Sequence, residues 1–68
     1  MPVASDLYRE HAERCEAEAA GAVLTHVRAR DLRSAAAWHA MAARRLKFER
    51  ACAERDRVAD EVRAQCLA

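Results

Sequence analysis

The sequence predicts an all-α fold, an antiparallel helical hairpin with a long second helix that assembles into a dimeric helical bundle. One glycine and one proline occur among its 68 residues. Alanine, arginine, glutamate and leucine make up most of the chain, and all four are good helix formers. On both sides of the glycine, apolar residues recur at steps of three and four, which is typical of helices that pack on one face.

The first helix is expected over about 6–20, followed by a turn over 21–25. Ser5 is a natural N-cap, and Asp6 places an acid in the first turn, where the helix dipole favours it. Gly21 can end the helix because glycine adopts a left-handed conformation without strain. Steps of four, three and four give this helix one packing face, at Tyr8, Ala12, Cys15 and Ala19.

The second helix is expected to begin near 26, with Thr25 as its N-cap, and to continue to about 66, because neither glycine nor proline interrupts it. Such a helix is roughly 60 Å long, against roughly 22 Å for the first. The charged stretch 53–57 is a possible break, from which a third helix could fold back. If the second helix is unbroken, the first covers only half of it, and the other half needs another partner.

An antiparallel hairpin with this turn places Tyr8 opposite Trp38. Two adjacent apolar stripes of the second helix together span about 200°, which is wider than one neighbour requires. A heptad-like seam continues from Met41 to Cys66. The expected hairpin core comprises Tyr8, Ala12, Cys15, Ala19, Val27, Ala35, Trp38 and Ala42. The expected interface with a helix of another chain comprises Trp38, Met41, Phe48, Cys52, Ala59 and Val62.

Three cysteines, an odd number without close spacing, argue against a disulfide framework. The N-terminal residues have no basic region followed by an apolar run, and no apolar stretch approaches the length of a membrane span. These features favour a cytoplasmic protein with reduced thiols and no membrane partner. Cys52 and Cys66 lie on the seam, where either could approach its mate across a symmetric dimer.

The net charge of +1 conceals an uneven distribution. Residues 1–27 carry a net charge of −3, residues 28–50 of +5 and residues 51–68 of −1. An acidic first helix beside a basic second helix helps to select their pairing, with little gain in stability. A ridge that could contact nucleic-acid phosphates consists of Arg30, Arg33, Arg44 and Lys47. Because no base-reading motif or aromatic stacking platform accompanies it, a solvated helix face is the favoured interpretation.

No catalytic, cofactor or metal site is expected. His11 and Cys15 lie four residues apart on one helix face, and His39 lies about a turn away across the hairpin, but the paired spacings of a zinc site are missing. Cys15 is better interpreted as a small core residue. A helical hairpin also offers little concavity for a substrate pocket. We therefore expect a protein that is not an enzyme and that binds no cofactor.

The stretch from Val27 to Ala42 resembles a pattern of small bacterial helical-hairpin proteins, in which a short helix and a small-residue turn precede V-R-x-R-x-L-x-x-A-x-x-W-x-x-M/L-A. The matching residues are Val27, Arg28, Arg30, Leu32, Ala35, Trp38, Met41 and Ala42. The resemblance covers roughly residues 8–44. It implies the hairpin and places Trp38 in its core, and it implies no activity.

The expected function is that of a small protein–protein interaction module, acting as an adaptor, assembly element or regulator through the apolar face of the second helix. The expected partner is a second copy of the chain or a larger protein. Two alternatives stay open. One is a nucleic-acid-associated protein that uses the basic ridge, and the other is a small subunit of a hetero-complex in which a different protein covers the apolar face.

Overall fold

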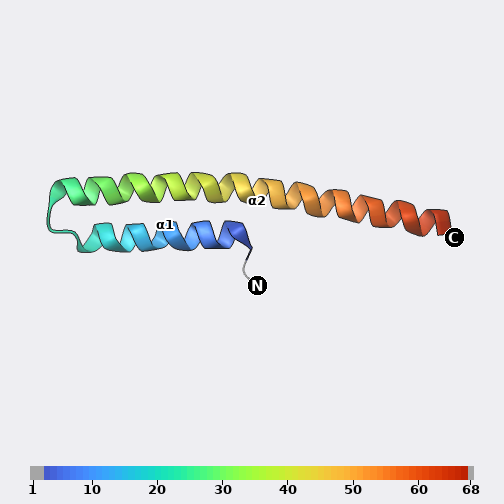
Figure 1. Cartoon of the computed structure of the whole chain (residues 1–68), viewed down its shortest axis with the longest axis horizontal. Coiled ribbons are helices and arrows are strands. Elements are labelled where there is room, and N and C mark those ends of the chain that lie inside the picture. The colour runs from blue at the N-terminus through green and yellow to red at the C-terminus, as the bar shows by residue number, and fades with distance from the viewer. Residues whose placement is uncertain (1–2, 68) are drawn as a thin grey trace.

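The computed structural model describes residues 3–67, which form a hairpin of two α-helices (Figure 1). Helix α1 spans Ala4–Gly21 and helix α2 spans Thr25–Leu67. The helices lie side by side and run in opposite directions, with the turn at one end of the molecule. The predicted all-α hairpin is confirmed, and the helix boundaries fall within two residues of those expected.

The N-cap predicted for α1 is wrong. The helix begins at Ala4, and Val3 before it has the extended backbone of an N-cap. The backbone N–H groups of Asp6 and Leu7 donate to the Val3 carbonyl, at N–O distances of 3.0 and 3.2 Å. Ser5 lies inside the first turn and is buried, and its hydroxyl donates to a side chain of α2 instead of capping α1.

The turn between the helices needs no left-handed residue, which corrects the role predicted for Gly21. Gly21 is the last residue of α1, and none of the described residues has a positive φ. Ala22 leaves the helix in an extended conformation, and its N–H donates to the Ala19 carbonyl at 3.2 Å. The Arg28 side chain donates to the Ala22 carbonyl at 2.9 Å and connects the turn to α2. Thr25, predicted as an N-cap, is the first residue of α2.

The centre of the helix–helix contact is built from small residues. The buried apolar residues within the described range are Ala12, Ala19 and Ala35. Larger residues expected in the core, such as Tyr8 and Trp38, are half-buried. Alanine loses no side-chain entropy on burial, but it removes little apolar area from water. The contact between α1 and α2 therefore contributes only modest stability.

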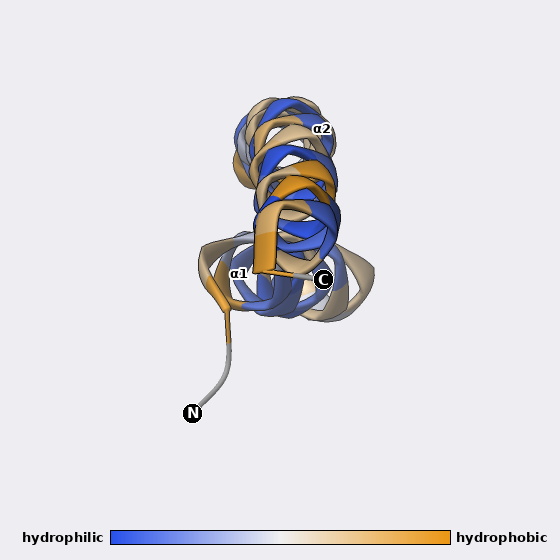
Figure 2. Cartoon of the chain, turned by 90° about the vertical axis from the view of Figure 1, so that its right-hand side faces the viewer, coloured by the Kyte–Doolittle hydropathy of each residue, from blue (hydrophilic) through white to orange (hydrophobic). Residues whose placement is uncertain are grey.

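Helix α2 continues without a break through 53–57, so no third helix forms within the described residues. It has 43 residues against 18 in α1, which corresponds to roughly 64 Å against roughly 27 Å. We call residues 50–67, which extend past α1 in Figure 1, the α2 tail. Every residue from 53 to 67 is exposed. Figure 2, which faces the C-terminal end of α2, shows polar and apolar residues alternating along this tail.

The molecule is therefore elongated, with extents of 65 × 19 × 10 Å and a Cα radius of gyration of 18.6 Å. A compact domain of this length has a radius of gyration of about 11 Å. The accessible surface is 5492 Å², whereas a compact monomer of the same mass exposes about 4,300 Å². The hairpin thus exposes about 1,200 Å² more than a compact monomer would.

Candidate protein–protein interface

A heptad repeat along α2 divides its surface between α1 and solvent. The residues packed against α1 include the two buried ones, Asp31 and Ala35, and the half-buried Trp38, Ala42 and Glu49. These occupy heptad positions a and e, with Trp38 at a. We call Trp38, Arg45, Cys52 and Ala59 the a row, and the adjacent Met41, Phe48, Arg55 and Val62 the d row.

The residues predicted as the interface occupy these two rows, and the two that lie farthest along the tail, Ala59 and Val62, are exposed. Both lie in the stretch from 53 to 67, in which every residue is exposed. Trp38, Met41 and Cys52 are half-buried, Phe48 is 50% exposed, Val62 is 52% exposed and Ala59 is exposed. Sequence reasoning missed Val58, which is 44% exposed and lies one turn before Val62. Its four-residue spacing from Val62 was the available signal.

Trp38 lies against two aromatic rings of α1. Its ring centroid is 5.7 Å from that of Tyr8, with the planes at 37°, as the sequence-based pairing of these residues anticipated. The His11 imidazole stacks on it at 4.6 Å, with the planes at 22°. Such ring pairs contribute about 0.5–1.5 kcal/mol beyond the area they bury. The cluster therefore fixes the register of α1 on α2, and it gives His11 a packing role that sequence reasoning missed.

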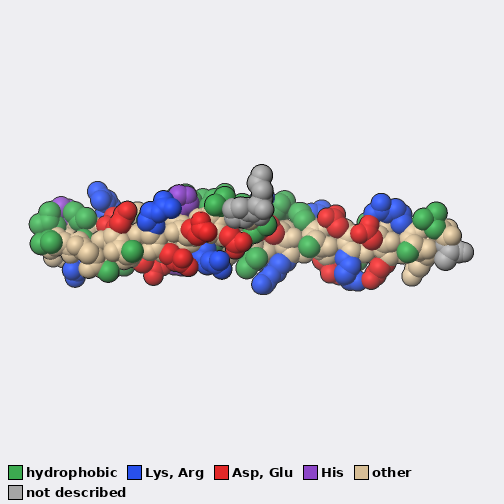
Figure 3. Space-filling model, turned by 90° about the horizontal axis from the view of Figure 1, so that it is seen from below, with side chains coloured by type: hydrophobic (Ala, Val, Ile, Leu, Met, Phe, Trp, Pro, Cys, Tyr) green, Lys and Arg blue, Asp and Glu red, His purple; other side chains and the backbone are tan. Residues whose placement is uncertain are grey.

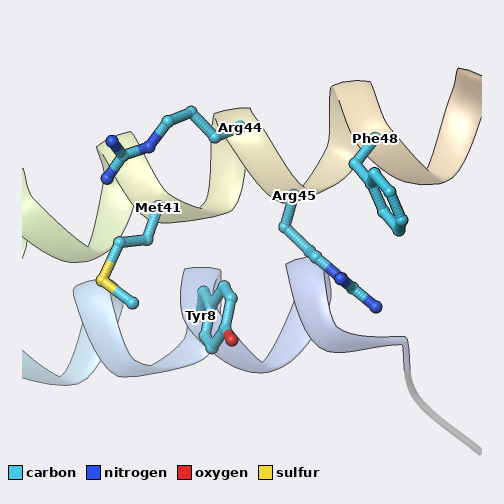
Figure 4. Close-up of a pocket in the computed structure, with 5 residues that line it drawn as sticks. All are labelled: Tyr8, Met41, Arg44, Arg45 and Phe48. Carbon is cyan, nitrogen blue, oxygen red and sulfur yellow. The ribbon is translucent and has the colours of Figure 1, made fainter.

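A shallow hollow of about 320 Å³ opens beside this cluster (Figure 4). Tyr8 lines it from α1, and Met41, Arg44, Arg45 and Phe48 line it from α2. The Arg45 guanidinium lies over the Phe48 ring, 4.8 Å from its centroid, in a cation–π contact. In Figure 4 the side chains of Met41, Arg45 and Phe48 descend from α2 toward α1. The hollow combines apolar walls with two cations, which suits an amphipathic helix better than a small substrate.

Polar residues also occupy the contact between the helices. The Ser5 hydroxyl donates to Glu49 Oε1 at 2.5 Å, and Glu49 Oε2 is buried without a hydrogen-bond partner in the described part of the chain. Asp31 is 8% exposed, and its Oδ1 lies 3.5 Å from Nη2 of Arg30. Sequence reasoning missed these contacts because a polar residue at a core position looks like an interruption of the apolar pattern.

The residues considered for a metal site do not come together. His39 pairs with Glu16, through a hydrogen bond between Nε2 and Oε1 of two half-exposed side chains, while His11 stacks on Trp38. Cys15 is half-buried with a free thiol. Over residues 3–67, no group of three or more His, Cys, Asp or Glu side chains could hold a metal ion.

Charge complementarity between the helices produces one cross-helix ion pair in the described part of the chain, between His39 and Glu16. The other ion pairs join residues of the same helix. The net charges of −3 on residues 1–27 and +5 on residues 28–50 therefore attract each other at long range and form few direct contacts. Most of the positive charge of α2 is left facing solvent.

The basic ridge is exposed over its whole length, and it occupies heptad positions g and c, directly beside the d row. Its members are Arg30, Arg33, Arg44 and Lys47. Arg30 pairs with Asp31, and Arg44 lines the hollow. Farther along α2, the same g and c positions hold Ala51, Glu54, Val58, Glu61 and Gln65, so the ridge gives way to an acidic flank, Glu54 and Glu61.

Charged side chains of both signs cover the tail in Figure 3. Arg57 donates to both Glu54 and Glu61, and Arg63 pairs with Asp60. The hydrogen bond from Arg57 lowers the pKa of Glu54 below its ordinary value. Pairs at i,i+3 and i,i+4 each add about 0.2–0.5 kcal/mol to an isolated helix. They support helical structure in residues 53–67, all of which are exposed.

Comparison of the chain with protein-family models, with curated proteins and with solved structures gives no match. Neither of the described helices is both long and apolar enough to cross a membrane. Function therefore has to be inferred from the surface of the hairpin itself.

Proposed function

We propose that the chain is a non-enzymatic protein–protein interaction module that acts as an assembly element, pairing through the a and d rows of α2 with a second copy of itself in a helical bundle. The observation that carries this proposal is the tail. It is helical, it carries apolar residues at heptad spacing, and all its residues from 53 onward are exposed. In proteins, most of the stability of a helix comes from packing of its apolar face and not from helix propensity.

The surface area agrees with a dimer. Stable interfaces bury about 1,200–2,000 Å² in total, or about 800 Å² on each partner. The excess surface of the hairpin, about 1,200 Å², is enough for one such contact on each copy. A contact of this size would also supplement the weak contact between α1 and α2, whose buried apolar residues are alanines.

The two rows complement each other in size, which favours a second copy over an unrelated partner. Among the predicted interface residues, the a row holds Trp38 and the small Cys52 and Ala59, and the d row holds the large Met41 and Phe48 and the smaller Val62. When two helices pack, large side chains of one fit the spaces left by small ones of the other. One sequence therefore supplies both halves of the contact.

The test is the solution mass of the full chain under reducing conditions, measured by size exclusion with light scattering over a range of concentrations. The wild type is expected to be a dimer, and Phe48→Glu is expected to be a monomer, because it places a charge in the d row. Leu32→Glu is the matched control, since Leu32 is also 50% exposed but lies on the other side of α2. It should keep the wild-type mass.

A monomeric wild type at all concentrations would overturn the proposal. Dissociation by Leu32→Glu and not by Phe48→Glu would show that the copies meet through the other side of α2. Circular dichroism of each variant separates loss of assembly from loss of helix.

A further inference from the structure

We propose that the second copy lies antiparallel, with the two-fold axis beside Arg50, so that the tail of each copy fills the groove between α1 and α2 of the other. This inference rests on the proposed function, which gives the surface but not the direction of pairing. Each half of the dimer is then a three-helix bundle made of α1, the first half of α2 and the tail of the second copy. The tail and α1 have the same length, 18 residues each, so the tail of one copy and α1 of the other cover the same length of α2.

The first argument is the match between the rows. Reversing one helix exchanges a and d positions, so each a residue meets a d residue of the second copy. With the axis beside Arg50, a residue that precedes position 50 in one copy faces the residue that follows position 50 by the same number in the other copy. The six interface residues then pair entirely among themselves: Phe48 with Cys52, Met41 with Ala59, and Trp38 with Val62. Each pair places a large side chain against a smaller one, as close packing requires.

The second argument is the position of α1. In a parallel pair, position g of one helix meets position e of the other. Between 31 and 49 the e positions of α2 are Ala35, Ala42 and Glu49, and all three are at least half-buried in the contact with α1. In an antiparallel pair, g meets g on one flank and e meets e on the other, so one flank of the pair is free of α1. The α1 helix therefore lies against both flanks of a parallel pair but against only one flank of an antiparallel pair, which favours the antiparallel arrangement.

The third argument is charge. The antiparallel pair brings the basic ridge of one copy beside the acidic flank of the other, because the ridge at positions g and c and the flank at position c lie on the same side of α2. Lys47 and Arg44 then lie level with Glu54 of the second copy. A parallel pair would instead align two segments that each carry a net charge of +5. Like-charged segments held together repel, whereas the antiparallel match steers the two copies together.

At one level of the antiparallel pair two cations lie together, Arg45 of one copy and Arg55 of the other. Arg45 already lies 4.0 Å from Glu49 and over the Phe48 ring. Arginine can pack its stem on apolar surface while its guanidinium reaches solvent. Asp56, which makes no ion pair within residues 3–67, brings a carboxylate to the same layer. These two arginines therefore lower the affinity of the two copies for each other, but they are compatible with the proposed antiparallel register.

The direction is tested by disulfide trapping. Met41→Cys and Ala59→Cys are combined in the full chain with Cys15, Cys52 and Cys66 replaced by serine, and its dimeric mass is measured first. Residues 41 and 59 lie about 27 Å apart in one helix, far beyond the limit of about 7 Å between the Cα atoms of a disulfide. With oxidised glutathione, the double variant is expected to form a covalent dimer on a non-reducing gel, and each single variant is expected to stay uncrosslinked.

Covalent dimers from the single variants would show a parallel, in-register pair and would overturn the antiparallel inference. A dimeric mass with no crosslink in any variant would overturn the register. Both results would leave the proposed function standing, whereas a monomeric wild type would remove both.

Charge reversal gives a second test that needs no cysteine replacement. Lys47→Glu and Glu54→Lys are each expected to raise the dimer dissociation constant about tenfold, because each sets like charges together. The double variant should return to near the wild-type value. Arg50→Glu, which changes the same charge on the outward side of α2, is the control and should leave the constant unchanged. Additive losses in the double variant would contradict the antiparallel contact.

Discussion

The hydroxyl of Ser5 donates a hydrogen bond of 2.5 Å to Glu49, a residue 44 positions later in the chain. Ser5 is 6% exposed, so the bond is shielded from water. It joins the first turn of α1 to the residue of α2 that immediately precedes the tail. The pair therefore marks the point at which α1 stops covering α2.

Ser5→Ala is expected to lower the free energy of unfolding by about 1–2 kcal/mol, because it leaves a half-buried carboxylate without its donor. Replacing both groups, in Ser5→Ala with Glu49→Leu, should restore much of this loss, since no polar group then stays unpaired. Urea denaturation, monitored by circular dichroism, measures the free energy of unfolding of the single and the double variant. A double variant that is less stable than Ser5→Ala would show that Glu49 contributes through another contact.

The architecture was predictable because local signals determine it. With one glycine, an uninterrupted second segment and apolar steps of three and four, the helix boundaries followed from propensity and periodicity. The position of Tyr8 opposite Trp38 followed from the turn alone, because antiparallel helices with a short connection have little freedom in register.

The ends of α1 were not predictable in the same way. Ser5 and Gly21 are common cap residues, but capping is one of several uses of each. Burial of Ser5 against Glu49 depends on a contact 44 residues away, which no local pattern reveals. Gly21 stays helical because Ala22 makes the exit in an extended conformation. For the candidate interface, the apolar rows followed from the spacing of residues in the sequence, whereas the point at which α1 stops covering them is known only from the structure.

Gly21→Ala is expected to stabilise the protein by about 0.5–1 kcal/mol. Gly21 is helical, and a Cβ built there meets no atom within 4 Å. Alanine at such a site lowers the entropy of the unfolded chain without strain in the folded one. Thermal unfolding measures the change. The neighbouring Ala20→Gly is the matched control and should lower stability by a similar amount, and a destabilised Gly21→Ala would mean that the turn needs a left-handed residue.

Asp31→Ala is expected to leave stability unchanged or to raise it. Asp31 is buried beside α1 with Arg30 as its one ion-pair partner within the described residues. Replacing a buried charge by a small apolar residue removes a desolvation cost that a single exposed partner offsets poorly. Arg30→Ala should be the more harmful change, by about 1 kcal/mol, because it leaves the carboxylate buried without its partner. The reverse order in urea denaturation would show that the carboxylate itself stabilises the hairpin.

Acid is expected to loosen the tail through Glu54. The hydrogen bond from Arg57 lowers the pKa of Glu54 below its ordinary value of 4.5. A group with a lowered pKa in the folded state contributes its stabilisation above the unfolded value, and this is lost as pH falls through the folded value. Helix content of the tail, followed residue by residue by NMR, should therefore decrease below pH 4.5. Glu54→Gln should show lower helix content near neutral pH and a smaller decrease on acidification. An equal decrease in both proteins would assign the acid response to other carboxylates.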